Sequence, residues 1–270
     1  MRLLKLIILI VKAIFSDLRS LANALYHYCE EANWKQYVTV KMGFAQGLPT
    51  IDLLDLLPGL NENIVDYTYL DGTSRVTDIV VLKSLARRFA GCSYLEIGSF
   101  RGESLVNVAA VAKECVSVSL SDNEMKELGL GEHVKLQRFF SGGLQNVLHV
   151  QHNSLTYDFS QLNRKFDLIF IDGDHSYAAV KKDTENAFKL LRDENSIIVW
   201  HDYGRSYNLE NWNTIAGMID GASAENRKKI YHISNTICSV FTNREYATTF
   251  PKPLDLPNKT FKINLSAEKI

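Results

Sequence analysis

The chain has 270 residues, of which 46% are apolar and 23% are charged, values close to the average of soluble globular proteins. This composition excludes disorder, collagen and coiled coil as starting points, and the length suits one large α/β domain with an appendage, or at most two small domains. The 30 basic and 31 acidic residues give a net charge of −1, so we expect no nucleic-acid partner. The four cysteines are too scattered for a disulfide scaffold or a CxxC metal site, and free thiols predict a reducing compartment, the cytoplasm.

The N-terminal segment predicts an amphipathic helix. Its longest unbroken apolar run is Leu6 to Val11, short of the about 20 residues that span a membrane, and Lys12 interrupts the apolar core that a secretory signal needs. Its polar positions share one stripe of a helix, at Arg2, Lys5, Lys12, Ser16 and Arg19. Residues 1–19 could therefore dock on their own domain, on a second copy of the chain in a homo-oligomer, or on a membrane surface as a peripheral contact.

Three regions follow one another along the chain. Residues 1–75 form an N-terminal extension, helical to about 45 and irregular over 46–75, where glycine and proline recur. Residues 76–245 form the main domain, which begins with a helix over 78–90 capped by Thr77 or Asp78. Residues 246–270 form a C-terminal tail.

Strands and helices alternate through the main domain. Short apolar runs predict strands at 94–97, 116–120, 133–139, 147–152, 166–171 and 196–200. Periodic segments predict helices at 103–113, 123–128, 176–192 and 211–220, and residues 229–233 and 237–242 predict a closing antiparallel pair. The alternation indicates an α/β fold with a mostly parallel sheet covered on both faces, which binds ligands at the carboxyl ends of its strands.

A glycine-containing turn follows the first of these strands. It reads Gly98-Ser99-Phe100-Arg101-Gly102, directly after Glu96 and Ile97. Two glycines permit close backbone approach to a ligand, and the next helix offers unpaired N–H groups, although an ordinary strand-to-helix turn also needs glycine. The dinucleotide fingerprint GxGxxG is not met, which argues against a nicotinamide enzyme. After the second strand, Asp122 is the nearest acid, and helix capping and ribose binding are equal alternatives for it.

Titratable side chains gather after two further strands. Asp172, Asp174 and His175 follow the run at 166–171, and His201 and Asp202 follow the run at 197–200. Asp172 and Asp202 are 30 residues apart, the length of one strand–helix–strand unit. If the two strands are neighbours, their ends lie about 5 Å apart and the five groups converge. Like charges this close are costly unless a cation, a proton or a substrate compensates them, so we expect a functional site here and not merely loop-capping acids.

These motifs together resemble a known family. The segments EIGSFRG at 96–102, FDLIFIDGDHSY at 166–177 and WHDY at 200–203 are similar to those of S-adenosylmethionine-dependent methyltransferases with a Rossmann-like fold. The branch most resembled contains small-molecule and sugar O-methyltransferases such as the macrocin-type enzymes, and the likeness covers about residues 75–245. It implies a three-layer Rossmann-like sheet whose closing strand is antiparallel, S-adenosylmethionine as the cofactor, and O-methylation of a small-molecule acceptor.

The resemblance also implies roles for the residues at the strand ends. The methionine part of the cofactor would lie at the glycine turn, the ribose near Asp122, and the adenine near Asn153 or Ser154. The cofactor-binding residues are then Glu96, Gly98, Ser99, Gly102, Asp122, Asn153, Ser154 and Asp172.

For catalysis, the resemblance implies a divalent metal on Asp172 and Asp202, and Asp174 as the general base. The chain departs from the family pattern at Phe100, where many members have glycine, and at His201, where relatives have an acid. An imidazole weakens the case for magnesium and leaves manganese, iron, zinc or no metal. His175 could equally be the base, and His201 a ligand, a base or a supporting partner.

Two other functions stay open. One is a nicotinamide-dependent oxidoreductase on a similar sheet, and the other is a non-catalytic relative that binds the cofactor, or only membrane and partners. The net charge disfavours an RNA methyltransferase. Acceptor specificity is expected in residues 1–75 and 203–228, with candidate wall residues Tyr203, Arg205, Tyr207 and Trp212.

Overall fold

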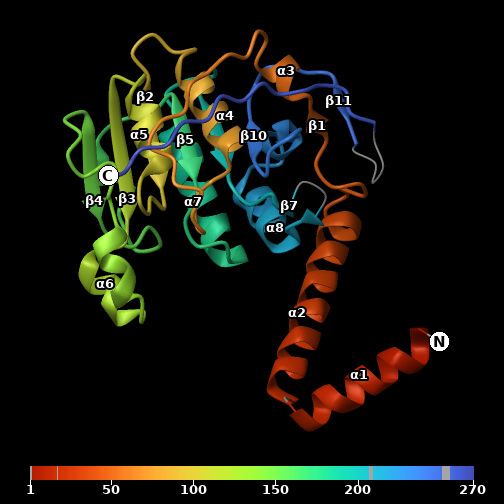
Figure 1. The fold of residues 1–270 in the computed structure, drawn as a ribbon. Helices are drawn as coiled ribbons and strands as arrows, with labels where there is room; N and C mark the ends of the chain where they lie inside the picture. The colour runs from red at the N-terminus through yellow and green to blue at the C-terminus, as the bar shows by residue number, and fades with distance from the viewer. Residues whose placement is uncertain (1, 17, 207–208, 251–255) are drawn as a thin grey trace.

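A computed structural model describes residues 2–16, 18–206, 209–250 and 256–270 (Figure 1). Its centre is a nine-stranded sheet in the order β11-β1-β9-β10-β6-β5-β2-β3-β4. The strands are β1 (Thr50–Ile51), β2 (Ser93–Ile97), β3 (Glu114–Ser119), β4 (Val147–Gln151), β5 (Leu168–Ile171), β6 (Ile197–Trp200), β9 (Ile230–Ile233), β10 (Ser239–Phe241) and β11 (Thr248–Thr249). A separate ribbon pairs β7 (Gly204–Ser206) with β8 (Leu209–Glu210).

The sheet is mostly parallel, as the alternation of elements predicts. Strands β4, β3, β2, β5 and β6 run parallel to their neighbours, and β10 lies antiparallel between β6 and β9. The antiparallel closing strand is therefore confirmed. The residues at 168–171 and 197–200 are buried, because helices cover both faces of these strands, and this explains why they read as unbroken apolar runs.

Helices form a layer on each face of the sheet. One apolar cluster joins Ile97 and Trp200 to α7 and α8, and the other joins Tyr94 and Phe170 to α4 and α5. The helices of the main body are α3 (Leu53–Leu56), α4 (Val76–Ala86), α5 (Glu103–Ala109), α6 (Asp122–Glu127), α7 (Tyr177–Leu190) and α8 (Trp212–Gly221). The three layers confirm the expected α/β class.

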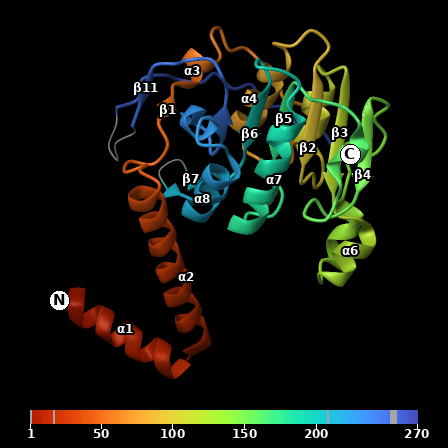
Figure 2. The same ribbon diagram turned by 180° about the vertical axis from the view of Figure 1, so that it is seen from behind.

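The N-terminal helices α1 (Arg2–Ser16) and α2 (Leu18–Gln36) leave this body (Figures 1 and 2). Only the far half of α2 is attached: Trp34 stacks on Tyr177 with ring centroids 4.5 Å apart, and the hydroxyl of Tyr37 donates to Asp220 at 2.7 Å. Helix α1 stands away from the body in both views, so it does not dock on its own domain. Among the described residues, no helix combines the length and the apolar character that crossing a bilayer requires.

Several local predictions are wrong. The expected strand at 133–139 is a 3₁₀ helix, Gly131–Leu136, because the chain beyond it bonds to the glycine turn: the N–H of Arg138 donates to the carbonyl of Phe100, and that of Phe140 to Arg101. Helix α4 is capped by Arg75, with Asp78 in its first turn, and α6 is capped by Ser121. The expected helix over 103–113 ends at Ala109, and the stretch 46–75, expected to be irregular, contains β1 and α3.

Candidate active site

The two strands that carry the acidic motifs are neighbours in the sheet. Ile171 of β5 pairs with Trp200 of β6, and the N–H of His201 donates to the carbonyl of Ile171. Asp172 and His201 therefore leave adjacent strands at the same edge. The adjacency that the 30-residue spacing predicts is confirmed.

His201 lies among three carboxylates. Its Nδ1 is 3.0 Å from both Asp172 Oδ1 and Asp202 Oδ2, and its Nε2 is 3.3 Å from Asp78 Oδ2. Burial alone would lower the pKa of this imidazole, but the charge of Asp172 and the close contacts with the three acids raise it well above its ordinary value. A protonated His201 would compensate the clustered acids from within the protein.

Asp78 is a site residue that sequence reasoning missed. It is fully buried in the first turn of α4, where its Oδ1 accepts from the N–H of Ile237 at 3.1 Å and its Oδ2 from the N–H of Arg75 at 2.9 Å. An acid at the start of a helix is adequately explained as a cap. The sequence therefore contained no signal that the side chain of Asp78 also reaches the ends of β5 and β6.

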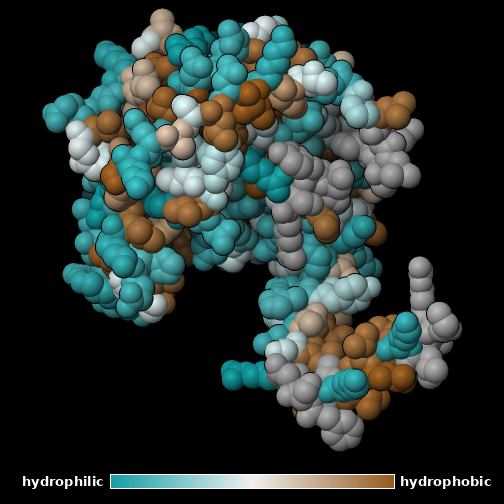
Figure 3. All heavy atoms as spheres, viewed as in Figure 1, coloured by the Kyte–Doolittle hydropathy of each residue, from teal (hydrophilic) through white to brown (hydrophobic). Residues whose placement is uncertain are grey.

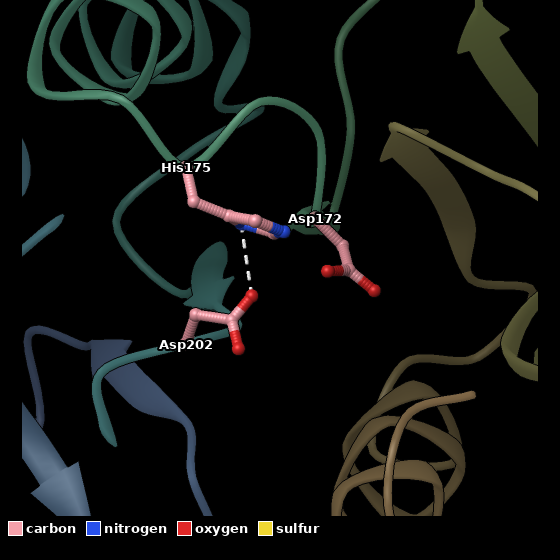
Figure 4. A group of neighbouring side chains, drawn as sticks. All are labelled: Asp172, His175 and Asp202. Carbon is pink, nitrogen blue, oxygen red and sulfur yellow. Dashed lines mark ion pairs between the residues drawn. The ribbon is translucent and has the colours of Figure 1, made fainter. Parts of the chain in front are cut away.

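His175 is the exposed member of the cluster and lies beside Asp202 (Figure 4). His175 Nδ1 is 2.8 Å from Asp202 Oδ2, and this hydrogen bond raises the pKa of His175 against the opposing effect of burial. Burial would raise the pKa of Asp202, but hydrogen bonds from His175 and His201 hold it below its ordinary value. Asp202 has a φ of 54°, a left-handed conformation that costs free energy and that clusters at functional sites.

A metal could be held by three of these residues. Asp172, His175 and Asp202 each offer one ligand atom, and these atoms lie within 4.8 Å of one another. One nitrogen and two oxygens suit zinc, manganese or iron better than magnesium, so the residues fit a divalent ion. His201 does not belong to this set, since both of its ring nitrogens already face carboxylates.

Asp174 does not join the ion-pair cluster with the other four groups. It is exposed, and its Oδ1 accepts from the N–H of Ser176 at 2.7 Å in the turn before α7. It does line a cavity of about 380 Å³, together with residues of α2, the 174–176 turn and the start of α8. The lining residues are His27, Glu30, Glu31, Trp34, Asp174, His175, Ser176, Asn211 and Asn213. In this lining, Asn211 is 8% exposed and its Oδ1 has no hydrogen-bond partner among the described residues.

The glycine turn lies on the other side of Asp172. Gly98 has a φ of 101°, and a Cβ on it would lie 2.2 Å from the carbonyl oxygen of Asp172, so the close packing of β2 against β5 requires glycine. Gly102 has a φ of 94° and is close to Ser141, and Ser99 is buried. Glu96 is fully buried, where it accepts from the hydroxyls of Tyr94 and Ser104, and burial raises its pKa to about 7.

The remaining expected cofactor residues lie at the ends of β3 and β4. Asp122 pairs with Arg138 at 2.8 Å. The N–H of Asn153 donates to Glu124 Oε1, and the hydroxyl of Ser154 donates to Asp183 Oδ2 at 3.2 Å. Glu124 and Asp183 are further residues that sequence reasoning missed, since both come from helices and meet the strand ends only in the fold.

Two of the expected wall residues belong to the core instead. Tyr203 and Trp212 are buried in the apolar cluster under α7 and α8, and Tyr203 stacks on His232 with centroids 4.3 Å apart. Tyr207 and the side chain of Arg205 lie outside the described residues.

Comparisons with known proteins bear on this arrangement. A family model described as a methyltransferase domain matches residues 95–203, in agreement with the resemblance noted from the sequence motifs. No curated protein matches the chain. Solved structures similar to it include the cofactor-bound protein Rv0187 from MTB (17% identity, 65% of this chain and 84% of that one, TM-score 0.47). Another is the O-methyltransferase from Bacillus cereus in complex with SAH (17% identity, 64% and 84%, TM-score 0.43).

Proposed function

We propose that the protein transfers the methyl group of S-adenosylmethionine to a hydroxyl of a small-molecule acceptor, a proposal supported by the match of residues 95–203 to a family model described as a methyltransferase domain. One observation carries this proposal: Asp172, His175 and Asp202 converge beside the glycine turn, at the carboxyl ends of adjacent strands.

The residues around the turn fit this cofactor. S-adenosylmethionine carries a positive sulfonium, an amino group and a ribose diol, all of which favour carboxylate partners. Glu96 lies near the end of β2, Asp122 begins α6 shortly after β3, and Asp172 directly follows β5. Bound there, the sulfonium supplies a methyl group for an in-line displacement that leaves a neutral thioether.

We assign the general base to His175. Asp202 engages its Nδ1, which leaves Nε2 as the ring nitrogen that can take the acceptor's hydroxyl proton, and the Asp202 carboxylate would stabilise the resulting imidazolium. His201 holds Asp202 and Asp172 in place. Asp174 lines the same cavity and is the second candidate for the base.

A metal on Asp172, His175 and Asp202 is a further proposal for the same site. Such an ion would supply Lewis-acid activation of the acceptor hydroxyl. An ion bound through the Nδ1 of His175 would compete with the contact that this nitrogen makes with Asp202.

We place the acceptor in the cavity of about 380 Å³ beside Asp174 and His175, a volume that suits a small molecule. Trp34 and Asn211 lie in its wall. The Oδ1 of Asn211, which has no hydrogen-bond partner among the described residues, could take a hydrogen bond from a hydroxyl of the substrate. The free cysteines, of which Cys92, Cys115 and Cys238 are buried, favour a reducing compartment, the cytoplasm. Residues 1–19 lie outside this chemistry and are proposed to contact a membrane surface or a second copy of the chain.

The test measures binding and turnover separately. S-adenosylmethionine, and not NAD, should raise the melting temperature, because a ligand at 100 times its Kd adds about 2.7 kcal/mol to the free energy of unfolding. Incubation with a panel of hydroxylated acceptors should then release S-adenosylhomocysteine. Stabilisation by NAD alone would overturn the proposal in favour of an oxidoreductase. Stabilisation by S-adenosylmethionine without turnover of any acceptor would favour the non-catalytic relative.

A further inference from the structure

Helix α1 exposes an unusual amount of apolar surface. Its apolar side chains from Leu6 to Val11, together with Ile14, are between 41% and 62% exposed, whereas the apolar residues of β2, β5 and β6 are at most 4% exposed. In Figure 3, brown side chains gather over α1, with a few teal side chains among them. Contiguous exposed apolar surface of this kind marks an interaction site.

Charge on α1 is of one sign only. Lys5 and Lys12 are exposed and seven residues apart, so they share one stripe of the helix, and no acid occurs before Asp17. Ile7, Ile10 and Ile14 lie on the opposite side of the helix. The partner must therefore be apolar in its interior and negative at its surface.

We propose that α1 lies in the surface of an anionic membrane, with its apolar side chains among the acyl chains and Lys5 and Lys12 at the level of the lipid phosphates. Lysine stems can cover apolar surface while their ammonium groups reach the headgroups. With 15 residues, α1 is about 22 Å long, shorter than the hydrocarbon core of about 30 Å, so it lies along the bilayer and does not cross it.

The shape of the apolar surface favours a membrane over a second copy of the chain. At about 100° per residue, the exposed apolar positions 6–11 and 14 spread over about 260° of the helix circumference. A single partner helix covers a stripe of roughly 100°, so pairing with another copy would leave apolar side chains in water. A bilayer interface covers everything except the narrow lysine stripe.

The test is sedimentation of the full chain with lipid vesicles. We expect at least tenfold tighter binding to vesicles of phosphatidylcholine mixed with phosphatidylglycerol than to phosphatidylcholine alone, and a decrease as salt is added. Lys5→Glu with Lys12→Glu should weaken binding to the anionic vesicles at least tenfold, since one basic side chain near such a surface contributes about fivefold. Ile7→Asp with Ile14→Asp should abolish binding to both vesicles.

The matched control is Lys126→Glu with Leu128→Asp, which changes one exposed charge and one exposed leucine at α6 and should leave vesicle binding unchanged. The melting temperature and its shift with S-adenosylmethionine check that every variant is folded. Equal binding to both vesicles, or no binding to either, would overturn the proposal. A dimer in light scattering that Ile7→Asp with Ile14→Asp dissociates, without vesicle binding, would identify a second copy as the partner. Vesicle binding needs no turnover, so it fails or succeeds independently of the proposed function.

Discussion

The two halves of the sheet edge are built differently. At the ends of β5 and β6, the Nδ1 of His201 is 3.0 Å from a carboxylate oxygen of both Asp172 and Asp202, and its Nε2 is 3.3 Å from the buried Asp78. At the ends of β3 and β4, Asp122 is 44% exposed and its single ion pair is with Arg138.

This difference indicates a division of labour. If the β5–β6 end performs the proposed proton transfer, its dense contacts suit that role, because a base must be held in line with the proton that it takes. The β3–β4 end makes local contacts that a ligand can replace at low cost. Substitutions at the first end should therefore change rates, and substitutions at the second should change affinities.

The largest effect is expected at His175. His175→Gln removes the proposed base, and kcat should fall about 10²- to 10⁴-fold while the thermal shift with S-adenosylmethionine is retained. The matched control is His152→Gln at the end of β4, where kcat should not change. An unchanged kcat in His175→Gln together with a large loss in Asp174→Asn would transfer the role of base to Asp174.

Next in size is the effect of Gly98→Ala, where the two halves meet. An alanine here would be held at a φ of 101°, and its Cβ would lie 2.2 Å from the backbone of Asp172. We therefore expect a loss of about 4 kcal/mol in the free energy of unfolding. Gly129→Ala has a comparable positive φ but no atom within 4 Å of its Cβ, and should cost only about 1 kcal/mol. Urea titration of both variants measures the difference. Equal losses would show that the strand ends are not tightly packed.

Asp183 of α7 accepts a hydrogen bond from Ser154, which follows β4, and so connects the two halves. Its raised pKa can be tested through the pH dependence of stability. Burial raises the pKa of this acid to about 6, even though Ser154 donates to it. Its folded form holds a proton more tightly than its unfolded form, so its contribution is fully present below pH 4 and is lost as the pH rises through 6. The free energy of unfolding of Asp183→Asn, minus that of the natural chain, should thus increase by about 3 kcal/mol between pH 4 and pH 8. A constant difference across this range in denaturant titrations would rule out the raised pKa.

The smallest effect is expected at Asp122. Asp122→Asn breaks an exposed ion pair and should change stability by less than about 1 kcal/mol. If the carboxylate holds the ribose, affinity for S-adenosylmethionine should fall about tenfold in calorimetry, the loss expected for one hydrogen bond to a charged group. Arg138→Gln breaks the same pair but keeps the carboxylate, so its affinity should stay the same. Equal affinities in both variants would limit Asp122 to pairing with Arg138.

The convergence of side chains at the β5–β6 end could be predicted, because the sequence features that indicate it lie close together along the chain. The apolar run before Asp172, the second run before His201 and the spacing between them are all readable along the chain, and parallel pairing then brings the side chains together. The roles of the individual side chains were not readable. Whether His201 binds a metal or compensates acids depends on Asp78, which is 123 residues away and arrives on a helix.

The β3–β4 end shows why other predictions were wrong. Residues 133–139 alternate like a strand, but Arg138 in this stretch and Phe140 just after it find backbone partners in the glycine turn and not in the sheet. Ser121 replaced Asp122 as the helix cap because its side chain and Glu124 form reciprocal bonds one residue earlier. In the first case tertiary contacts with the glycine turn outweighed the strand pattern. In the second, the Ser121–Glu124 bonds outweighed the capping preference of Asp122.

Helix α2 connects α1 to the body. At its far end Trp34 stacks on Tyr177, and just beyond it Tyr37 donates to Asp220, which also accepts from Tyr177. The residues of α2 that line the cavity begin at His27, about 14 Å along the helix from Leu18. A protein anchored through α1 would hold the cavity near the membrane and search for acceptors by lateral diffusion in two dimensions. Acceptors that partition onto the same surface would then reach it more often than acceptors dissolved in bulk water.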